Sequence, residues 1–135
     1  MKRIATIIIR NSRKQFFVHQ RVSTKNTFPN LFGLGAGGHI EEYETNQEGA
    51  IRELFEETGL YIKPTFLFEF FYESGKETYP ISVFEIVTDE PITATANEWQ
   101  WSGWLSQKDV DKLSKDKKLC PDTNIFYQKY CSDYM

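Results

Sequence analysis

The order of strand-like and helix-like segments along this chain predicts an α/β fold, in which a sheet is packed between helices. Three observations lead to this prediction: β-branched runs near the start, one amphipathic helical pattern in the middle, and two helical segments near the end. The length of 135 residues matches a single domain over 1–135, and no internal repeat or low-complexity linker divides it.

Runs of β-branched and aromatic residues mark the expected strands. A turn at 11–14 joins the first two strands into an N-terminal hairpin, and Gly75 lies in the turn of a second hairpin. The glycine-rich segment 33–38 is not expected to form an ordinary strand, because glycine there indicates that the backbone closely approaches another group. The expected strands cover residues 3–9, 15–20, 65–73, 78–87 and 98–105.

Three helices are expected from apolar periodicity and from capping residues. Residues 46–58 carry a helical pattern that ends at Gly59, a residue type favoured just beyond a helix C-terminus. Ser106 is a suitable N-cap for a short helix over 107–114, and residues 121–132 are expected to form a terminal helix.

Composition and charge exclude several classes of protein. The 16 Lys and Arg against 19 Asp and Glu give a net charge of −3. This charge disfavours binding to bulk nucleic acid, which rests on neutralising phosphates. The longest apolar run near the start, residues 4–9, is too short for a signal peptide or a membrane span. We therefore expect a cytoplasmic protein with no membrane partner, either a monomer or a homodimer.

The two cysteines are expected to be free thiols. If Cys120 and Cys131 both lie on the terminal helix, roughly 16 Å separates them, which is beyond the reach of a disulfide. Neither residue is flanked by His or Cys at metal-binding spacing, so a zinc site is not expected.

The helix expected over 46–58 separates into two faces. Glu53, Glu56 and Glu57 cluster within one and a half turns, although like charges at this spacing repel one another. Two interpretations are open for such a cluster: a solvated acidic face, or a site for hard divalent cations, which prefer carboxylate oxygens and water. The other face is expected to be buried and consists of Ile51, Leu54, Phe55 and Thr58.

The surrounding sequence favours the second interpretation. From Gly38 the chain reads GHIEEYETNQEGAIRELFEETGL, which fits the pattern G-x5-E-x7-R-E-U-x-E-E-x-G-U at every position, where U is apolar. This segment resembles the Nudix box of the Nudix hydrolases, also called MutT-like proteins. Its fixed positions are Gly38, Glu44, Arg52, Glu53, Glu56, Glu57 and Gly59, with Leu54 and Leu60 at the apolar sites.

The resemblance implies a Nudix-type α/β/α sandwich with a mixed β-sheet. It also implies hydrolysis of a nucleoside diphosphate linked to another moiety, with Mg²⁺, or alternatively Mn²⁺, as the cofactor. The expected partner is therefore a small-molecule diphosphate derived from a nucleotide. Tyr43 departs from the family pattern, since many members have glycine there, but it removes no metal ligand.

The resemblance also assigns roles to individual residues of the segment. Glu56 and Glu57 match metal ligands, and the carbonyl of Gly37 matches a backbone ligand. Glu53 matches a further carboxylate, which acts as a metal ligand or as the general base. Arg52 matches the arginine that pairs with the acidic cluster and orients it.

Two further glutamates are candidates for the catalytic site. Glu44 occupies the first glutamate position of the box. Glu98 precedes Trp104 by six residues and matches an acidic residue that supplies a metal ligand or the base in many members; the alternative is an ordinary strand-edge glutamate. Trp99 and Trp101 either offer a stacking surface to the pocket or contribute to packing.

The segment before the box indicates a branch of the family. VHQRVSTKNTFPNLFGLGAGGHI resembles a subgroup related to type I isopentenyl-diphosphate isomerase. This resemblance implies that Arg21 and Lys25 bind the substrate diphosphate, for which both side chains are chemically suited. It also places Gly38 and His39 at the substrate, with His39 as a possible metal ligand. The alternatives are a solvated basic loop for the first pair and a plain strand residue for His39.

The isomerase activity itself is disfavoured by one position. That enzyme needs a cysteine immediately before the Gly-His pair, where this chain has Gly37, and Cys120 and Cys131 are distant in sequence. Hydrolysis is therefore the preferred activity, with isomerisation and a non-catalytic diphosphate-ligand sensor as alternatives. A sensor would be expected to lose box glutamates, and this chain has all of them.

Overall fold

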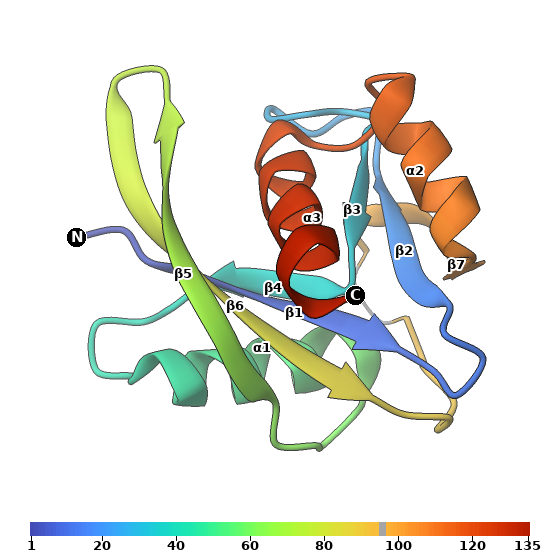
Figure 1. Ribbon diagram of the computed structural model, residues 1–135. Coiled ribbons are helices and arrows are strands. Elements are labelled where there is room, and N and C mark those ends of the chain that lie inside the picture. The colour runs from blue at the N-terminus through green and yellow to red at the C-terminus, as the bar shows by residue number, and fades with distance from the viewer. Residues whose placement is uncertain (95–96) are drawn as a thin grey trace.

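The structure is a computed structural model that describes residues 1–94 and 97–135 (Figure 1). All the expected strands and helices are present, with ends that differ by at most two residues. In chain order they are β1 (Ile4–Arg10), β2 (Phe16–Arg21), β3 (Phe32–Leu34), β4 (Ala36–His39), α1 (Asn46–Thr58), β5 (Thr65–Ser74), β6 (Glu77–Val87), β7 (Trp99–Leu105), α2 (Gln107–Lys115) and α3 (Pro121–Tyr134).

The strands form one mixed sheet, which confirms the predicted α/β class. Its main path within the described residues is β3-β2-β1-β6-β5, while β4 also pairs with β1 and β7 with β2. Strand β1 runs parallel to β6 from Ile4↔Ile81 to Arg10↔Val87, and the other pairings are antiparallel. The first half of β1 therefore lies between β6 and β4, and this brings the segment 36–39 to the centre of the molecule.

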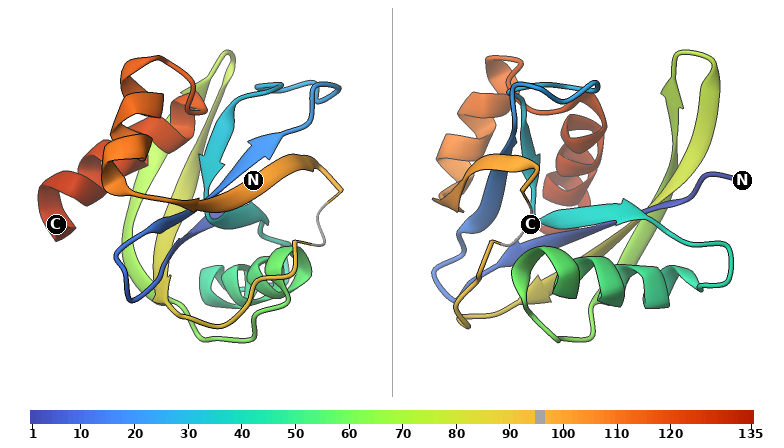
Figure 2. Two further views of the ribbon diagram at one scale, coloured as in Figure 1. Left: turned by 90° about the vertical axis from the view of Figure 1, so that its right-hand side faces the viewer. Right: turned by 180° about the vertical axis from the view of Figure 1, so that it is seen from behind.

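Successive side chains of β1 point to opposite faces of the sheet and pack into two separate hydrophobic cores. The architecture is therefore an α/β/α sandwich. Ile7 and Ile9 pack on the side of α1, where Leu54 is fully buried. Ile8 packs on the opposite side with Tyr127 of α3 and with α2. Figures 1 and 2 show α1 on one face of the sheet and α3 on the other.

The glycine-rich segment 33–38 differs from the expectation, because it forms two short strands, β3 and β4. They are separated at Gly35, whose φ is +63°. A Cβ atom at this position would lie 1.7 Å from the carbonyl oxygen of Ile7. Glycine is therefore required where the chain changes from one strand to the next. The N-terminal hairpin is also short, since β1 and β2 pair only through Arg10 and Phe16.

Helix α1 begins at a capping box and ends at a left-handed glycine. The Thr45 hydroxyl accepts a hydrogen bond from the Glu48 amide, and the Glu48 side chain accepts one from Thr45. Gly59 has φ +76° and donates its amide hydrogen to the Phe55 carbonyl, as a C′ residue does. The capping box has no counterpart among the sequence-based expectations.

The buried face of α1 was predicted only in part. Leu54 and Thr58 are buried as expected, but Phe55 is 52% exposed, with its ring against Tyr61. The helix is turned toward Gly49, where a Cβ would lie 2.9 Å from Ile40. This close approach leaves no room for a Cβ unless Ile40 shifts, and Ile51, which was also expected on the buried face, is only partly buried.

Two smaller expectations concern the cysteines and the membrane. Both Cys120 and Cys131 are free thiols, as predicted. Within the described ranges, no helix is long and apolar enough to cross a membrane.

Candidate functional site

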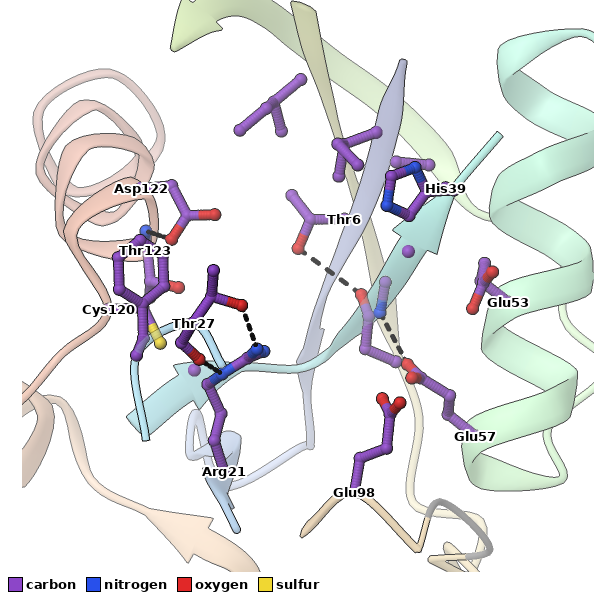
Figure 3. Close-up of a pocket in the computed structure, with 18 of the residues that line it drawn as sticks. Thr6, Arg21, Thr27, His39, Glu53, Glu57, Glu98, Cys120, Asp122 and Thr123 are labelled. Atoms are coloured by element: carbon purple, nitrogen blue, oxygen red, sulfur yellow. Dashed lines mark hydrogen bonds between the residues drawn. The ribbon is translucent and has the colours of Figure 1, made fainter. Parts of the chain in front are cut away.

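A cavity of about 690 Å³ lies between the β1–β4 edge, α1 and the start of α3. Figure 3 shows Glu53, Glu57 and Glu98 on one side of this cavity and Asp122 on the other. Of the residues predicted for the site, those that line the cavity are Arg21, Lys25, Gly37, Gly38, His39, Glu53, Glu56, Glu57 and Glu98. Arg52 and Glu44 do not line the cavity. Arg52 donates hydrogen bonds both to Glu53, which does line it, and to Glu44.

Glu57 is the most perturbed carboxylate of the cavity. Its side chain reaches from α1 to β4 and accepts a hydrogen bond of 2.8 Å from the Gly37 amide. Burial raises the pKa of Glu57 to about 8, against the opposing effect of this bond, and the charges of Glu53 and Glu98 add to the rise. The geometry thus holds a carboxylate that has an unusually strong tendency to bind a proton or a cation.

Glu53 lies directly over Gly38. A Cβ atom at Gly38 would lie 2.6 Å from the Glu53 carboxyl carbon, so the missing side chain makes room for the carboxylate. Burial raises the pKa of Glu53, and its 3.0 Å hydrogen bond from Arg52 opposes that rise. The Gly37-Gly38 pair, whose second residue is the first of the box, therefore has two functions. Gly37 supplies an amide to Glu57, and Gly38 supplies space for Glu53.

Arg52 holds the acidic cluster in place by hydrogen bonds, although it does not itself line the cavity. Its guanidinium donates 2.7 and 2.9 Å hydrogen bonds to the two carboxylate oxygens of Glu44, and one of 2.9 Å to the carbonyl of His39. The remaining nitrogen, Nη1, donates to Glu53 at 3.0 Å and lies 3.3 Å from Glu56. Hydrogen bonds from Arg52 lower the pKa of Glu44 to about 2. Glu44 is therefore a charged anchor for Arg52.

Lys25 and Glu98 form an ion pair at the rim. The Lys25 ammonium lies 2.9 Å from a Glu98 carboxylate oxygen, and the Val22 amide donates to the Glu98 carbonyl at 2.9 Å. The two residues were predicted for different roles, one at the diphosphate and the other at the metal. Their contact joins the loop after β2 to the start of β7.

Arg21 and His39 occupy different walls of the cavity. Arg21 donates to the carbonyl and hydroxyl of Thr27, which orients its guanidinium. His39 is an exposed residue at the end of β4, and Figure 3 places it on the Glu53 side of the cavity. Its carbonyl, rather than its ring, makes the contact with Arg52.

The two tryptophans contribute to packing. The Trp99 ring is stacked on His19 with centroids 4.4 Å apart, and Trp101 contacts Phe32. The His19 Nδ1 lies 2.8 Å from the Gly35 carbonyl, and burial lowers the pKa of His19 to about 4. His19 is therefore neutral at pH 7 and donates Nδ1–H to Gly35.

None of the site residues predicted from the sequence lies on α3, although this helix contributes to the cavity. Cys120, Asp122, Thr123 and Phe126 all line it, although they lie sixty or more residues beyond the box. No motif marks these positions, and their only local feature is an acidic residue in the first turn of a helix.

The residues present suit a hard divalent cation. Glu57 is a largely buried carboxylate with a raised pKa, and Glu53 and Glu56 face the same cavity. The negative charges of these three carboxylates repel one another, and a bound cation would replace that repulsion with attraction. Carboxylate oxygens are the ligands that Mg²⁺ prefers. Among residues 1–94 and 97–135, no three His, Cys, Asp or Glu side chains form a metal cage by themselves.

Comparison with known proteins agrees with this geometry. A family model described as NUDIX domain matches residues 1–129. The chain belongs to the NUDIX family. An uncharacterized Nudix hydrolase of Streptomyces coelicolor is 29% identical over 116 residues, which cover 84% of this chain. The chain spans 64% of the length of that relative.

Solved NUDIX structures share the fold. The MutT protein of Methanosarcina mazei Go1 superimposes with a TM-score of 0.81 at 21% identity, covering 98% of this chain and 94% of its own. The NUDIX domain of Shewanella oneidensis NrtR, solved with ADP-ribose, has a TM-score of 0.80 at 15% identity and covers 98% and 88%. Both confirm the predicted Nudix-type sandwich.

Proposed function

We propose that this NUDIX protein is a divalent-metal-dependent hydrolase of a diphosphate linkage in a nucleoside diphosphate derivative, with water attacking phosphorus. The single observation that carries the proposal is the convergence of Glu53, Glu56 and Glu57 on one cavity that also holds Arg21 and Lys25. The ADP-ribose bound to the NrtR domain supports the substrate class, since it is such a derivative.

Glu56 and Glu57 would hold the Mg²⁺ or Mn²⁺ ion, with the Gly37 carbonyl beside them and Glu53 or Glu98 as further ligands. A divalent ion held there would neutralise the diphosphate and polarise phosphorus. Because Mg²⁺ usually keeps several waters and binds through few carboxylates, an incomplete protein cage is compatible with it.

The basic residues have separate tasks in this mechanism. Arg21, oriented by Thr27, presents a planar guanidinium that suits a phosphate, and Lys25 supplies a point charge. Their assignment to the diphosphate follows the predicted isomerase-related branch and is part of the proposal. Arg52 has no such task, because Glu44, Glu53 and the His39 carbonyl occupy its donors.

The general base is Glu53 or Glu98, and the two differ in their surroundings. Glu53 is 14% exposed and hydrogen-bonded to Arg52, while Glu98 is 55% exposed and paired with Lys25. Burial raises the pKa of Glu53, which favours proton uptake from water. Loss of a positioned base typically lowers kcat about 10²- to 10⁴-fold, so Glu53→Gln and Glu98→Gln should separate the candidates.

An isomerase would need a proton-transferring thiol in this cavity. Cys120 does line the cavity, contrary to the expectation from its place in the sequence, but burial raises its pKa to about 12. The position immediately before Gly38-His39, where the isomerase needs its cysteine, is Gly37 in this chain. Hydrolysis is therefore the function that the site supports best.

A substrate panel with Mg²⁺ tests the proposal, following phosphate, diphosphate and nucleoside monophosphate release separately. The proposal requires metal-dependent release of one of these products and its loss in excess chelator. An isomerase would release none of them, and a sensor would bind a panel member without cleaving it.

A further inference from the structure

The wall of the cavity opposite the box glutamates is built by the start of α3. Cys120, Asp122 and Thr123 lie on this wall, and Figure 3 shows the Asp122 carboxylate facing into the cavity. In the proposed function, the reacting end of the diphosphate lies beside Glu53 and Glu57. The moiety attached to that diphosphate must then extend toward α3.

Asp122 has hydrogen-bonding capacity left over. One of its carboxylate oxygens, Oδ1, accepts the Thr123 amide at 2.9 Å. Its other hydrogen bond comes from its own backbone amide, and among residues 1–94 and 97–135 no side chain donates to it or forms an ion pair with it, whereas a carboxylate has about four acceptor sites. Burial raises the pKa of Asp122, and the charges of Arg21 and Lys2 only partly offset that effect. This half-buried acceptor lacks its full set of partners.

Apolar and aromatic side chains line the cavity together with Asp122. Phe28, Tyr79, Ile81 and Phe126 line the same cavity, and Tyr79 and Phe126 are almost fully buried. The nearby Lys2 ammonium lies 4.3 Å from the Tyr79 ring centroid, and it also lies 3.8 Å from Glu77. The α3 end thus combines apolar side chains with a carboxylate that the Thr123 amide holds in place.

We propose that Asp122 is a specificity-determining residue that accepts a hydrogen bond from the amino group of the substrate nucleobase. This inference deepens the proposed function and rests on it. A carboxylate accepts from an exocyclic base amino group, and the apolar walls suit the faces of a planar ring. An alkyl diphosphate would bury Asp122 without a donor, which is unfavourable. The predicted class is therefore an amino-bearing nucleotide rather than a prenyl diphosphate.

Matched substrates test this assignment directly. Diphosphate derivatives of cytidine against uridine, guanosine against inosine, and adenosine against purine riboside differ at the amino group. For at least one pair we expect the amino-bearing member to have a kcat/KM about tenfold higher or more. Asp122→Ala should reduce that ratio to within about twofold, and Asp122→Asn, which keeps one acceptor, should give an intermediate ratio. The exposed Glu73→Gln is the control and should leave the ratio unchanged.

The outcomes separate this inference from the proposed function. If the wild-type enzyme cleaves both members of every pair equally, or if Asp122→Ala leaves the preference intact, the assignment of Asp122 is wrong. If no member is cleaved, the proposed hydrolase function fails instead. Calorimetric binding of the matching nucleoside monophosphates without metal then still tests Asp122, with the same expected loss of preference in Asp122→Ala.

Discussion

Arg52 and Glu44 form a bidentate ion pair, with the guanidinium Nε 2.7 Å from Oε2 and Nη2 2.9 Å from Oε1. The Glu44 side chain is only 8% exposed, and that of Arg52 is 27% exposed. The pair fixes the loop that follows β4 against α1, and the free edge of the guanidinium then reaches Glu53. Arg52 and Glu44 therefore act by holding Glu53 in place.

Arg52→Ala should destabilise the protein by about 2 kcal/mol, because it leaves a buried Glu44 charge without its partner. Glu44→Gln should have a smaller effect, and the double variant should be less destabilised than the sum by about 1 kcal/mol. Urea unfolding measures these differences. The exposed pair Lys129–Asp133, at 3.0 Å, is the control and should contribute about 0.5 kcal/mol or less. Strict additivity at Arg52 and Glu44 would contradict the coupling.

Gly37→Ala should mainly lower stability, whereas Gly38→Ala should mainly lower activity. A Cβ at Gly37 meets the Ala5 carbonyl at 2.4 Å, so this change should disrupt the β1–β4 pairing and destabilise the protein by on the order of 3 kcal/mol. At Gly38 the Cβ meets the flexible end of Glu53, so stability should change by less than about 1 kcal/mol. Displacement of Glu53 should nevertheless lower kcat about tenfold or more. Thermal unfolding and kinetics of both variants provide the comparison.

Glu57→Gln should separate metal binding from folding. The substitution removes a carboxyl group whose burial raises its pKa to about 8 and therefore costs folding free energy at neutral pH, so the metal-free variant should unfold at or above the wild-type temperature. Mg²⁺ should raise the wild-type Tm, because it binds the folded state, and should leave the Glu57→Gln Tm unchanged. Calorimetric unfolding in chelator and in Mg²⁺ measures this. An equal Mg²⁺ shift in both proteins would remove Glu57 from the metal site.

His19 should make stability depend on pH between about 4 and 6.5. Its folded pKa is lowered to about 4 from an ordinary value of 6.5, so only the unfolded chain takes up the proton in this window. Stability therefore falls as the pH is lowered, by at most about 1.4 kcal/mol per pH unit from this group. Glu57, with a raised pKa, acts in the opposite direction over part of the window.

The measurement is consequently the difference between wild type and His19→Asn in urea unfolding at pH 4.5, 5.5 and 6.5. The wild type should lose stability relative to the variant as the pH falls. His39→Asn keeps His19 and should run parallel to the wild type across the series. A constant difference between wild type and His19→Asn would show that His19 does not have a lowered pKa.

Much of this protein is determined by local sequence pattern. The box predicts where α1 ends, because Gly59 can adopt the left-handed conformation, and which carboxylates share one helical face. Alternating and β-branched runs likewise predict most of the strands, since the periodicity of side chains is a property of the backbone itself. Those features need no knowledge of what lies across the sheet.

Contacts between distant segments decided the rest. Gly49 packs against Ile40 without room for a Cβ. Phe55, which periodicity alone assigns to the core, is about half exposed. Lys25 and Glu98 form an ion pair although 73 positions separate them in the sequence. Asp122 lines the same cavity as the box glutamates although it lies more than 60 residues beyond the box. Such contacts follow from how the helices and loops pack around β1, because only packing sets which side chains share a cavity and which charges lose their water.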